Sequence, residues 1–165
     1  MSSLTPMEVV PLSLPFAADI CTWRYPAPYD CYDMTDADPR ELAQTESGFF
    51  AVVQGGTLIG FRSFGSDGRV PGWAYDEAAL DTGGGLRPEL TGRGFGKAAI
   101  TTGLEFGRLH FAPAAFRVTV ADFNSRALRT VKALGFKPLG AFSAATDGRC
   151  FQVLLRPEAR SSDSR

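Results

Sequence analysis

The chain has 165 residues, of which 44% are hydrophobic and 21% are charged, a composition typical of a globular domain and not of a disordered chain. Its 17 basic and 18 acidic side chains give a formal net charge of −1, which argues against partners that demand a basic excess, such as nucleic acids and anionic membrane surfaces. There is no basic residue before Arg24 and no apolar run of about 20 residues, so we expect a cytoplasmic protein without a signal peptide or membrane span.

The first fifty residues contain short elements separated by irregular chain. We predict a strand near residues 8–12 and a helical turn or two over 14–23. Residues 23–32 read WRYPAPYDCY, which is too rich in proline and aromatic side chains to predict a regular element. Asp38, followed by proline and then by Glu41, predicts the N-cap of a short helix that ends near Thr45.

The middle of the chain predicts a hairpin, a strand and a long helix. Residues 49–53 and 58–64 are largely apolar and flank the turn sequence Gln-Gly-Gly-Thr. A weaker strand over 79–86 contains three consecutive glycines. A helix over 93–110 follows, because apolar or small residues recur at intervals of three and four. The face that this spacing predicts to be buried is formed by Phe95, Ala98, Ala99, Thr102, Phe106 and Leu109.

The last third predicts a strand over 116–121, a helix over 124–134 that Gly135 ends, and an antiparallel pair over 136–144 and 150–155. The whole chain therefore predicts a single α/β domain over residues 1–156, with a mixed, mostly antiparallel sheet. The polar, Ser/Arg-rich residues 157–165 predict a disordered C-terminal tail.

Cysteine and histidine give little support for a metal centre. Cys21, Cys31 and Cys150 are odd in number and lack the spacing of zinc half-sites. His110 is the only histidine and falls at the end of a predicted helix, where packing or capping is commoner than catalysis. We therefore expect no metal cofactor.

The most informative segment is the glycine-rich loop between the strand over 79–86 and the long helix. Glycines at 92, 94 and 96 let the backbone adopt positive φ and approach a ligand closely. The N-terminus of the next helix adds unpaired N–H groups and the positive end of a dipole, so the segment predicts an anion cradle suited to a pyrophosphate. Three cations, Arg87, Arg93 and Lys97, outnumber the single carboxylate of Glu89.

Two common phosphate-binding motifs fit this loop poorly. A Walker loop needs glycine where Thr91 stands and serine or threonine where Ala98 follows the lysine. A dinucleotide fingerprint matches Gly94-Phe-Gly-Lys-Ala-Ala99, but it requires the strand to run directly into the first glycine. A polar stretch over 87–93, which contains a proline, intervenes here.

A third pattern fits both this loop and the region after it. Thr91-Gly-Arg-Gly-Phe-Gly96 follows a strand, and Asn124 opens a helix that ends in Leu-Gly-Phe136. Together these segments resemble the paired motifs of the GNAT acyltransferase superfamily, with threonine in place of the usual Gln or Arg. The resemblance covers about residues 48–156, and residues 23–34 resemble an N-terminal stretch of some bacterial members. It implies a three-layer acyl-CoA N-acyltransferase fold, with the sheet splayed where the strands over 79–86 and 116–121 part.

The resemblance implies transfer of an acetyl group from acetyl-CoA to an amine. The backbone N–H of Leu86 would stabilise the oxyanion, and Leu86 would also contact the coenzyme. The Asn124 side chain would contact the pantetheine arm or the backbone next to it. The pyrophosphate would be held by the backbone N–H groups of Gly92, Arg93, Gly94, Phe95, Gly96 and Lys97.

Proton transfer is less well specified. Asp81 is the only carboxylate on the strand that leads into the loop, so it is the candidate base that would deprotonate the amine. Many relatives place a tyrosine acid where this chain has Val131. The substitutes open to the chain are water or the hydroxyls of Tyr75, Ser125 and Thr130.

The acceptor would meet the aromatic N-terminal segment, because aromatic faces and the nearby carboxylates of Asp30 and Asp33 suit a cationic amine. The candidate acceptor-binding residues are Trp23, Tyr25, Tyr29 and Tyr32. A non-catalytic acyl-CoA-binding sensor is the alternative, motivated by Val131 and Thr91. A homodimer is left open, since pairing through C-terminal strands is common in the superfamily.

Overall fold

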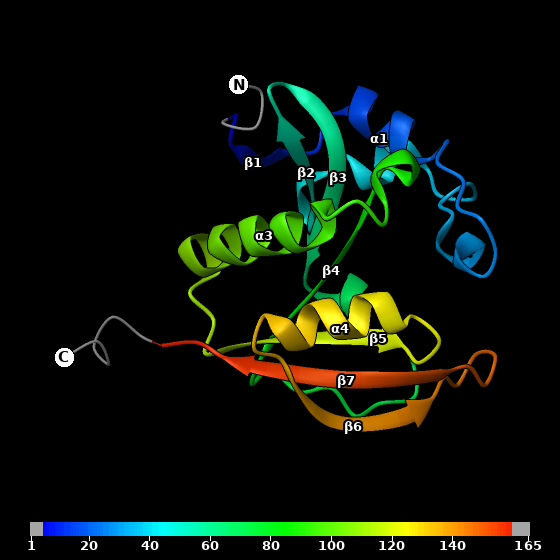
Figure 1. The fold of residues 1–165 in the computed structure, drawn as a ribbon, viewed down its shortest axis with the longest axis vertical. Helices are drawn as coiled ribbons and strands as arrows, with labels where there is room; N and C mark the ends of the chain where they lie inside the picture. Colours follow the sequence, from blue (N-terminus) through cyan, green and yellow to red (C-terminus); the bar gives the residue numbers. More distant parts are fainter. Residues whose placement is uncertain (1–4, 160–165) are drawn as a thin grey trace. The chain divides into compact units, whose positions relative to one another are not determined.

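The structure is a computed structural model that describes residues 5–159. The chain divides into two compact units, Met1–Arg62 with Gly84–Gly103 and Ser63–Gly83 with Leu104–Arg165. Figure 1 labels the helices and strands along the chain, and the hydrogen-bonded strand order is β1-β2-β3-β4-β5-β7-β6. The elements that run from one unit into the other are β3 (Thr57–Phe64), β4 (Leu80–Leu86) and α3 (Phe95–Phe111).

The first unit contains the N-terminal strands and two short helices. β1 (Met7–Pro11) pairs antiparallel with β2 (Phe49–Gln54), and β2 is followed by β3 in the predicted hairpin. The Ser13 hydroxyl accepts a hydrogen bond from the N–H of Phe16 and so caps α1 (Leu14–Ile20). The Asp38 carboxylate caps α2 (Pro39–Leu42) in the same way.

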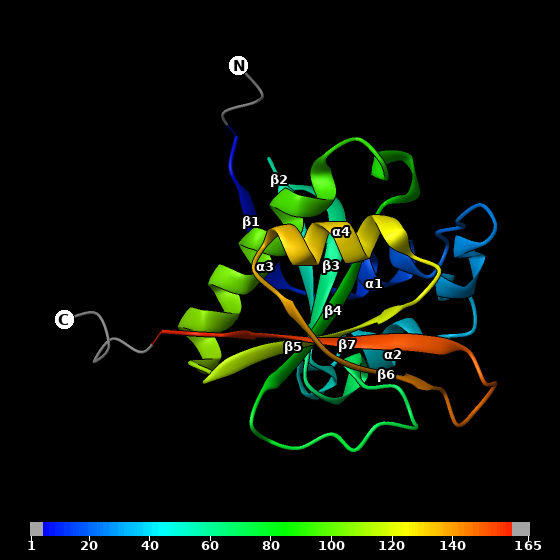
Figure 2. The same cartoon turned by 60° about the horizontal axis from the view of Figure 1, so that its bottom comes forward.

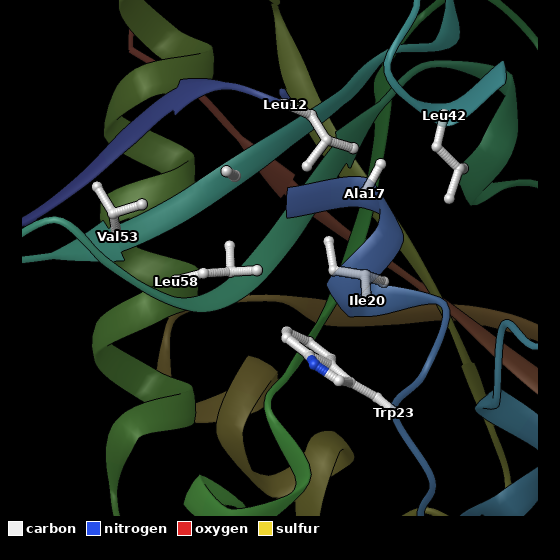
Figure 3. Close-up of a cluster of buried hydrophobic side chains, with 8 residues drawn as sticks. Leu12, Ala17, Ile20, Trp23, Leu42, Val53 and Leu58 are labelled. Carbon is white, nitrogen blue, oxygen red and sulfur yellow. The ribbon is translucent and has the colours of Figure 1, made fainter. Parts of the chain in front are cut away.

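The core of this unit lies between α1, α2 and the first strands (Figure 3). The α1 positions that face inward, Ala17 and Ile20, are three residues apart and so share one side of the helix. Each large aliphatic side chain buried here contributes about 1.5–3 kcal/mol to stability. The buried members of the cluster are Leu12, Ala17, Ile20, Trp23, Leu42, Ala51, Val53 and Leu58.

The second unit is built around β5 (Ala115–Ala121), β6 (Lys137–Ser143) and β7 (Cys150–Pro157). β7 pairs antiparallel with both of the others. α4 (Ser125–Ala133) runs beside β5 and β7 in both Figure 1 and Figure 2, and it buries Leu128 and Val131. β4 pairs parallel with β5 through Leu80↔Phe116 and Asp81↔Arg117, the first two residues of β4. That β4 and β5 separate beyond these two pairs stays a prediction.

The sequence-based elements are confirmed in order and type, with three differences. α1 ends at Ile20 and α2 at Leu42, so both helices are shorter than expected. The segment expected to be irregular contains a four-residue 3₁₀ helix, Tyr29–Tyr32. Pro157 is the last residue of β7, and the N–H of Glu158 donates to the Ala114 carbonyl, so the prediction that places these two residues in a disordered tail is wrong for both. Residues 160–165 of that tail lie outside the described residues.

The buried face of α3 also differs from the predicted one. Leu109 was expected to be buried but is 75% exposed, and Ala98 is exposed as well. The positions that pack inward are Ala99, Gly103, Leu104 and Gly107. Of the predicted positions, Ala99 is buried, and Phe95, Thr102 and Phe106 are half-buried. The prediction left out Gly103 and Gly107 because glycine carries little hydrophobic signal. Within residues 5–159, no helix combines the length and the hydrophobicity needed to cross a bilayer.

Candidate active site

The glycine loop lies in the first unit, between the end of β4 and the start of α3. A 3₁₀ turn over Pro88–Leu90 follows β4, and α3 begins at Phe95. Gly92 and Gly94 have φ values of 73° and 87°, in the left-handed region that favours glycine. A Cβ added to Gly94 would meet no heavy atom within 4 Å, so this stretch of backbone is open on one side.

That geometry suits an anion. The first turn of a helix leaves its N–H groups without intrahelical acceptors, which here applies to Phe95, Gly96 and Lys97. The same helix end carries the positive pole of the dipole. Chain positions 92–97 therefore combine an exposed backbone with donors in excess of acceptors, and they fit the diphosphate of a coenzyme.

The three loop cations have different surroundings. Lys97 is exposed, and the Arg93 guanidinium donates to the Glu89 carbonyl, at 3.5 Å. The Arg87 guanidinium instead makes two hydrogen bonds within the first unit. Its Nε donates to the Leu58 carbonyl at 3.1 Å, and its Nη2 donates to the Asp19 carboxylate at 2.6 Å. The positive charge of Arg87 is therefore balanced by the Asp19 carboxylate, which the sequence did not reveal as its neighbour, and a contribution of Arg87 to the cradle stays a prediction.

Asp19 and Trp23 hold Arg87 in place. The Arg87 guanidinium lies 5.0 Å from the centre of the Trp23 ring, within the range of a cation–π interaction. The Trp23 indole N–H also donates to Asp19, at 3.1 Å. Trp23 is only 5% exposed and belongs to the hydrophobic core. This environment favours a structural role for Trp23 over the predicted contact with an acceptor.

Tyr25 reaches the residue just before Arg87. Its hydroxyl donates to the Leu86 carbonyl at 2.6 Å, and its own N–H donates to Asp33 at 2.9 Å. Burial, and then the negative charges of Asp33 and Glu89, raises the pKa of Tyr25 to about 12. The hydroxyl therefore stays protonated, and a donor, over the whole physiological range of pH.

The register of β3 and β4 sets the direction of the Leu86 backbone. The Arg87 N–H donates to the Ile59 carbonyl, and the Gly65 N–H donates to the Asp81 carbonyl. The higher residue number on β3 is therefore paired with the lower one on β4, which makes the pairing antiparallel. Hydrogen-bonded and non-hydrogen-bonded pairs alternate in such a ladder, which places Leu86 opposite Gly60 in a non-hydrogen-bonded pair. The N–H and carbonyl of Leu86 therefore point away from β3.

The other predicted aromatic residues lie in the 3₁₀ helix of the same unit. Tyr32 is 41% exposed and Tyr29 is half-buried. Asp30 follows Tyr29 and Asp33 follows Tyr32, so rings and carboxylates occur together in this segment of the first unit. Of the four predicted acceptor-binding residues, Tyr29 and Tyr32 remain suited to that role.

Asp81 belongs to the second unit and is surrounded by arginines. Its carboxylate accepts two hydrogen bonds from Arg117, at 2.7 and 2.8 Å, and one from Arg69, at 2.8 Å. The side chains of Asp81 and Arg117 are 1% and 3% exposed. The hydrogen bonds to Asp81 raise the pKa of Arg117, which keeps the guanidinium charged.

This network extends to the loop between β3 and β4. Arg117 also donates to the Asp76 carboxylate at 3.0 Å and to its carbonyl at 2.8 Å. Arg69 and Arg117 lie 5.5 and 5.1 Å from the centre of the Tyr75 ring. A carboxylate held by three guanidinium donors and shielded from solvent is poorly placed to take a proton from an amine, so the geometry favours a structural role for Asp81 over that of the base.

Asn124 and Val131 lie on α4, also in the second unit. The Asn124 side-chain oxygen accepts from the Ala127 N–H at 3.1 Å, so the residue is the N-cap of the helix. Val131, which stands where the family resemblance implies a tyrosine acid in many members, is buried. Two of the hydroxyls that could replace this tyrosine as the acid already make hydrogen bonds. The Tyr75 hydroxyl shares one with the Thr119 hydroxyl at 2.8 Å, and the Thr130 hydroxyl donates to the Arg126 carbonyl.

Sequence reasoning missed Asp19, which accepts from both Arg87 and Trp23. No local pattern could have revealed it, because Asp19 and Arg87 are 68 positions apart in the chain. Among the described residues, no group of three or more His, Cys, Asp or Glu side chains is arranged to hold a metal ion.

Comparison with known families matches residues 16–136 to the acetyltransferase (GNAT) family. Among curated proteins, the N-alpha-acetyltransferase RimI of Mycobacterium tuberculosis is 29% identical over 101 residues. That alignment covers 61% of this chain and 59% of RimI, so the matched part spans less than two thirds of the relative's length.

Solved structures show the same fold. A spermidine N-acetyltransferase SpeG chimera from Vibrio cholerae and hSSAT superposes with a TM-score of 0.72 at 16% identity, covering 93% of this chain and 96% of the other. AAC(6')-Ib in complex with ribostamycin and coenzyme A gives 0.72 at 14%, with 93% and 94% covered. The yncA structure from Salmonella typhimurium, with acetyl-CoA, gives 0.65 at 14%, with 94% and 96% covered.

Proposed function

The chain belongs to the acetyltransferase (GNAT) family, and from this premise we propose that it transfers the acetyl group of acetyl-CoA to the nitrogen of an amine. The observation that carries the proposal is the loop at the start of α3. Gly92 and Gly94 adopt positive φ, the backbone at Gly94 is open, and the free N–H groups of the helix end follow directly. Gly148 also combines positive φ with open space, but a strand follows it, whereas the loop at Gly94 leads into the N-terminus of α3.

Within this proposal the backbone does most of the binding. The N–H groups of residues 92–97 would hold the diphosphate of the coenzyme, and Asn124 would contact its pantetheine arm. The Leu86 N–H, which points away from β3, would donate to the oxygen of the thioester. Acetyl-CoA itself supplies an activated acetyl group with a good leaving thiol.

The acceptor in this proposal is a cationic amine. Tyr29 and Tyr32 offer aromatic faces, and Asp30 and Asp33 offer negative charge in the same segment. An ammonium group must lose a proton before it attacks. Because the Asp81 carboxylate is held by Arg117 and Arg69, we assign that proton to water rather than to Asp81.

Steady-state release of CoA thiol, measured with a panel of small amines, amino acids and peptide N-termini, tests the proposal. We expect turnover with at least one amine and no turnover without an acceptor beyond slow hydrolysis. Binding of acetyl-CoA with no turnover across the panel would favour the sensor alternative, which the buried Val131 in the usual acid position motivates. If NAD(H) but not CoA raised the melting temperature of the protein, both the acetyltransferase and the acyl-CoA sensor would be excluded.

The proposal includes a cytoplasmic location, and it leaves a homodimer open. Fractionation of the source cells tests the first point. Sedimentation of the purified protein tests the second.

A further inference from the structure

We propose that Tyr25 is a positioning residue for acyl transfer, acting through the backbone of Leu86. This inference rests on the proposed function, because it assigns a task to the residue whose N–H would meet the thioester oxygen. It also changes the interpretation of Tyr25, which the sequence placed among the acceptor-binding residues.

The first step is the peptide group between Leu86 and Arg87, which is held at both ends. Its carbonyl accepts from the Tyr25 hydroxyl at 2.6 Å, and its N–H donates to the Ile59 carbonyl at 2.8 Å. Neither bond alone fixes the plane of this peptide. Together they fix its rotation about the strand axis and so restrict the backbone torsions of Leu86.

The second step is that Tyr25 acts on the edge of β4 that faces away from β3. The N–H and carbonyl of one strand residue point to the same side, so the Leu86 N–H lies on the edge that Tyr25 reaches. β3 cannot stabilise Leu86 on that side, since Leu86 stands in a non-hydrogen-bonded pair with Gly60. The Tyr25 hydroxyl therefore provides a hydrogen bond to Leu86 that the pairing of β3 with β4 cannot provide.

The third step is that Tyr25 is itself fixed. Its N–H donates to Asp33, and its ring packs against the hydrophobic core of the first unit. A Cβ added to Gly85 would lie 3.4 Å from the Tyr25 hydroxyl, so that hydroxyl lies close against the β4 backbone. A donor held this firmly can define the position of the Leu86 N–H to the precision that stabilisation of a developing negative charge demands.

The test compares Tyr25→Phe with the wild type and with Ser47→Ala. Phenylalanine keeps the ring and removes only the hydroxyl. Ser47 is a matched control in the same unit, because its hydroxyl donates to a backbone carbonyl, that of Leu42, at 2.8 Å. Replacement of Tyr25 by 4-aminophenylalanine restores a donor at nearly the same place and serves as the rescue.

The first readout is the affinity of each protein for acetyl-CoA and for CoA, measured by calorimetry. The two ligands differ in the thioester carbonyl, so we expect Tyr25→Phe to weaken acetyl-CoA about fivefold or more and to leave CoA within about twofold. With an active acceptor, kcat should fall by about tenfold or more while the KM for the acceptor changes little. Ser47→Ala should lower the melting temperature without either effect, and 4-aminophenylalanine should recover most of the loss.

Each outcome decides the inference. Equal weakening of both ligands, or unchanged values for both together with an unchanged kcat, would overturn the role of Tyr25 and leave the proposed function standing. A wild type that binds neither ligand would overturn the proposed function and this inference with it. A wild type that binds both but acetylates no amine would refute the proposed catalysis, and the ratio of the two affinities would still decide whether Tyr25 positions Leu86.

Discussion

Asp81 and Arg117 stand opposite each other in the parallel pairing of β4 and β5, and two hydrogen bonds of 2.7 and 2.8 Å join their side chains. Both side chains are almost fully shielded from solvent. A buried pair of this kind is stable only as a pair, because the loss of one partner leaves an uncompensated charge in the interior. The residue that seemed from sequence to be a base is therefore one half of a structural contact.

Asp81→Asn is expected to lower the free energy of unfolding by about 3–5 kcal/mol, since the Arg117 guanidinium loses its buried counter-charge. Chemical denaturation measures this change. Asp147→Asn is the control, because Asp147 pairs with Arg149 at an exposed site and should cost about 0–1 kcal/mol. Turnover per folded molecule should stay within about threefold of the wild type. A loss of about a hundredfold with an altered pH–rate profile would return Asp81 to the role of base.

Gly94→Val is expected to raise the Kd for CoA by well over tenfold. Valine at a φ of 87° strains the loop and adds a branched side chain where the backbone is open. Gly148→Val carries the same kind of strain, at a φ of 75° and also in open space, but in a turn of the second unit. Calorimetric titration of both variants separates the two effects. If Gly94→Val binds CoA as the wild type does, the loop is not the diphosphate site.

Two substitutions test separately the side-chain oxygen of Asn124, which caps α4, and its amide N–H donor. Asn124→Ala removes the cap of α4 and should cost about 0.5–2 kcal/mol of stability. Asn124→Ser keeps an oxygen that can cap the helix but lacks the amide N–H donor, so its stability should stay near that of the wild type. Weaker binding of CoA by Asn124→Ser would support the contact with the pantetheine arm. Unchanged binding would contradict the contact with the pantetheine arm.

Trp23 and Tyr32 should respond in opposite ways to truncation. Trp23→Ala removes a core side chain and should cost about 3–5 kcal/mol of stability. Tyr32→Ala, at a position that is 41% exposed, should cost less stability than Trp23→Ala and should instead raise the KM for the acceptor. Denaturation curves and acceptor kinetics measure the two effects. A KM unchanged by Tyr32→Ala would remove that ring from the acceptor site.

The raised pKa of Tyr25 predicts a pH dependence at the alkaline end. With a pKa of about 12 in the folded protein and 10 in the unfolded chain, the unfolded state releases this proton first. The stability that Tyr25 contributes is therefore complete below pH 10 and is lost as the pH rises from 10 towards 12. The wild type should lose more unfolding free energy over this window than Tyr25→Phe. Absorbance of tyrosinate should also show one late step that the variant lacks. Identical alkaline curves would contradict the burial of this hydroxyl.

Local signals in the sequence predicted much of the fold and the loop. The N-caps at Asp38 and Asn124 and the positive φ of Gly92 and Gly94 were identified correctly because each depends on neighbours within four positions. Gly96, which was grouped with those two glycines, lies in α3 and does not have positive φ. What the sequence could not predict are contacts between distant segments. The bond from Tyr25 to Leu86 joins residues 61 positions apart, and the pair of Asp81 and Arg117 joins residues 36 apart. Sequence periodicity indicates which side chains can be buried, but it does not predict which of them contact each other.

The chain crosses between the two compact units three times, after Arg62, after Gly83 and after Gly103. Neither unit is therefore one uninterrupted stretch of polypeptide, and no single truncation of the gene can isolate one of them. Genetic fragments that split the protein would have to reassemble from interleaved pieces. Because the three crossing points lie inside β3, β4 and α3, segments exchanged between homologues should carry each of these elements whole.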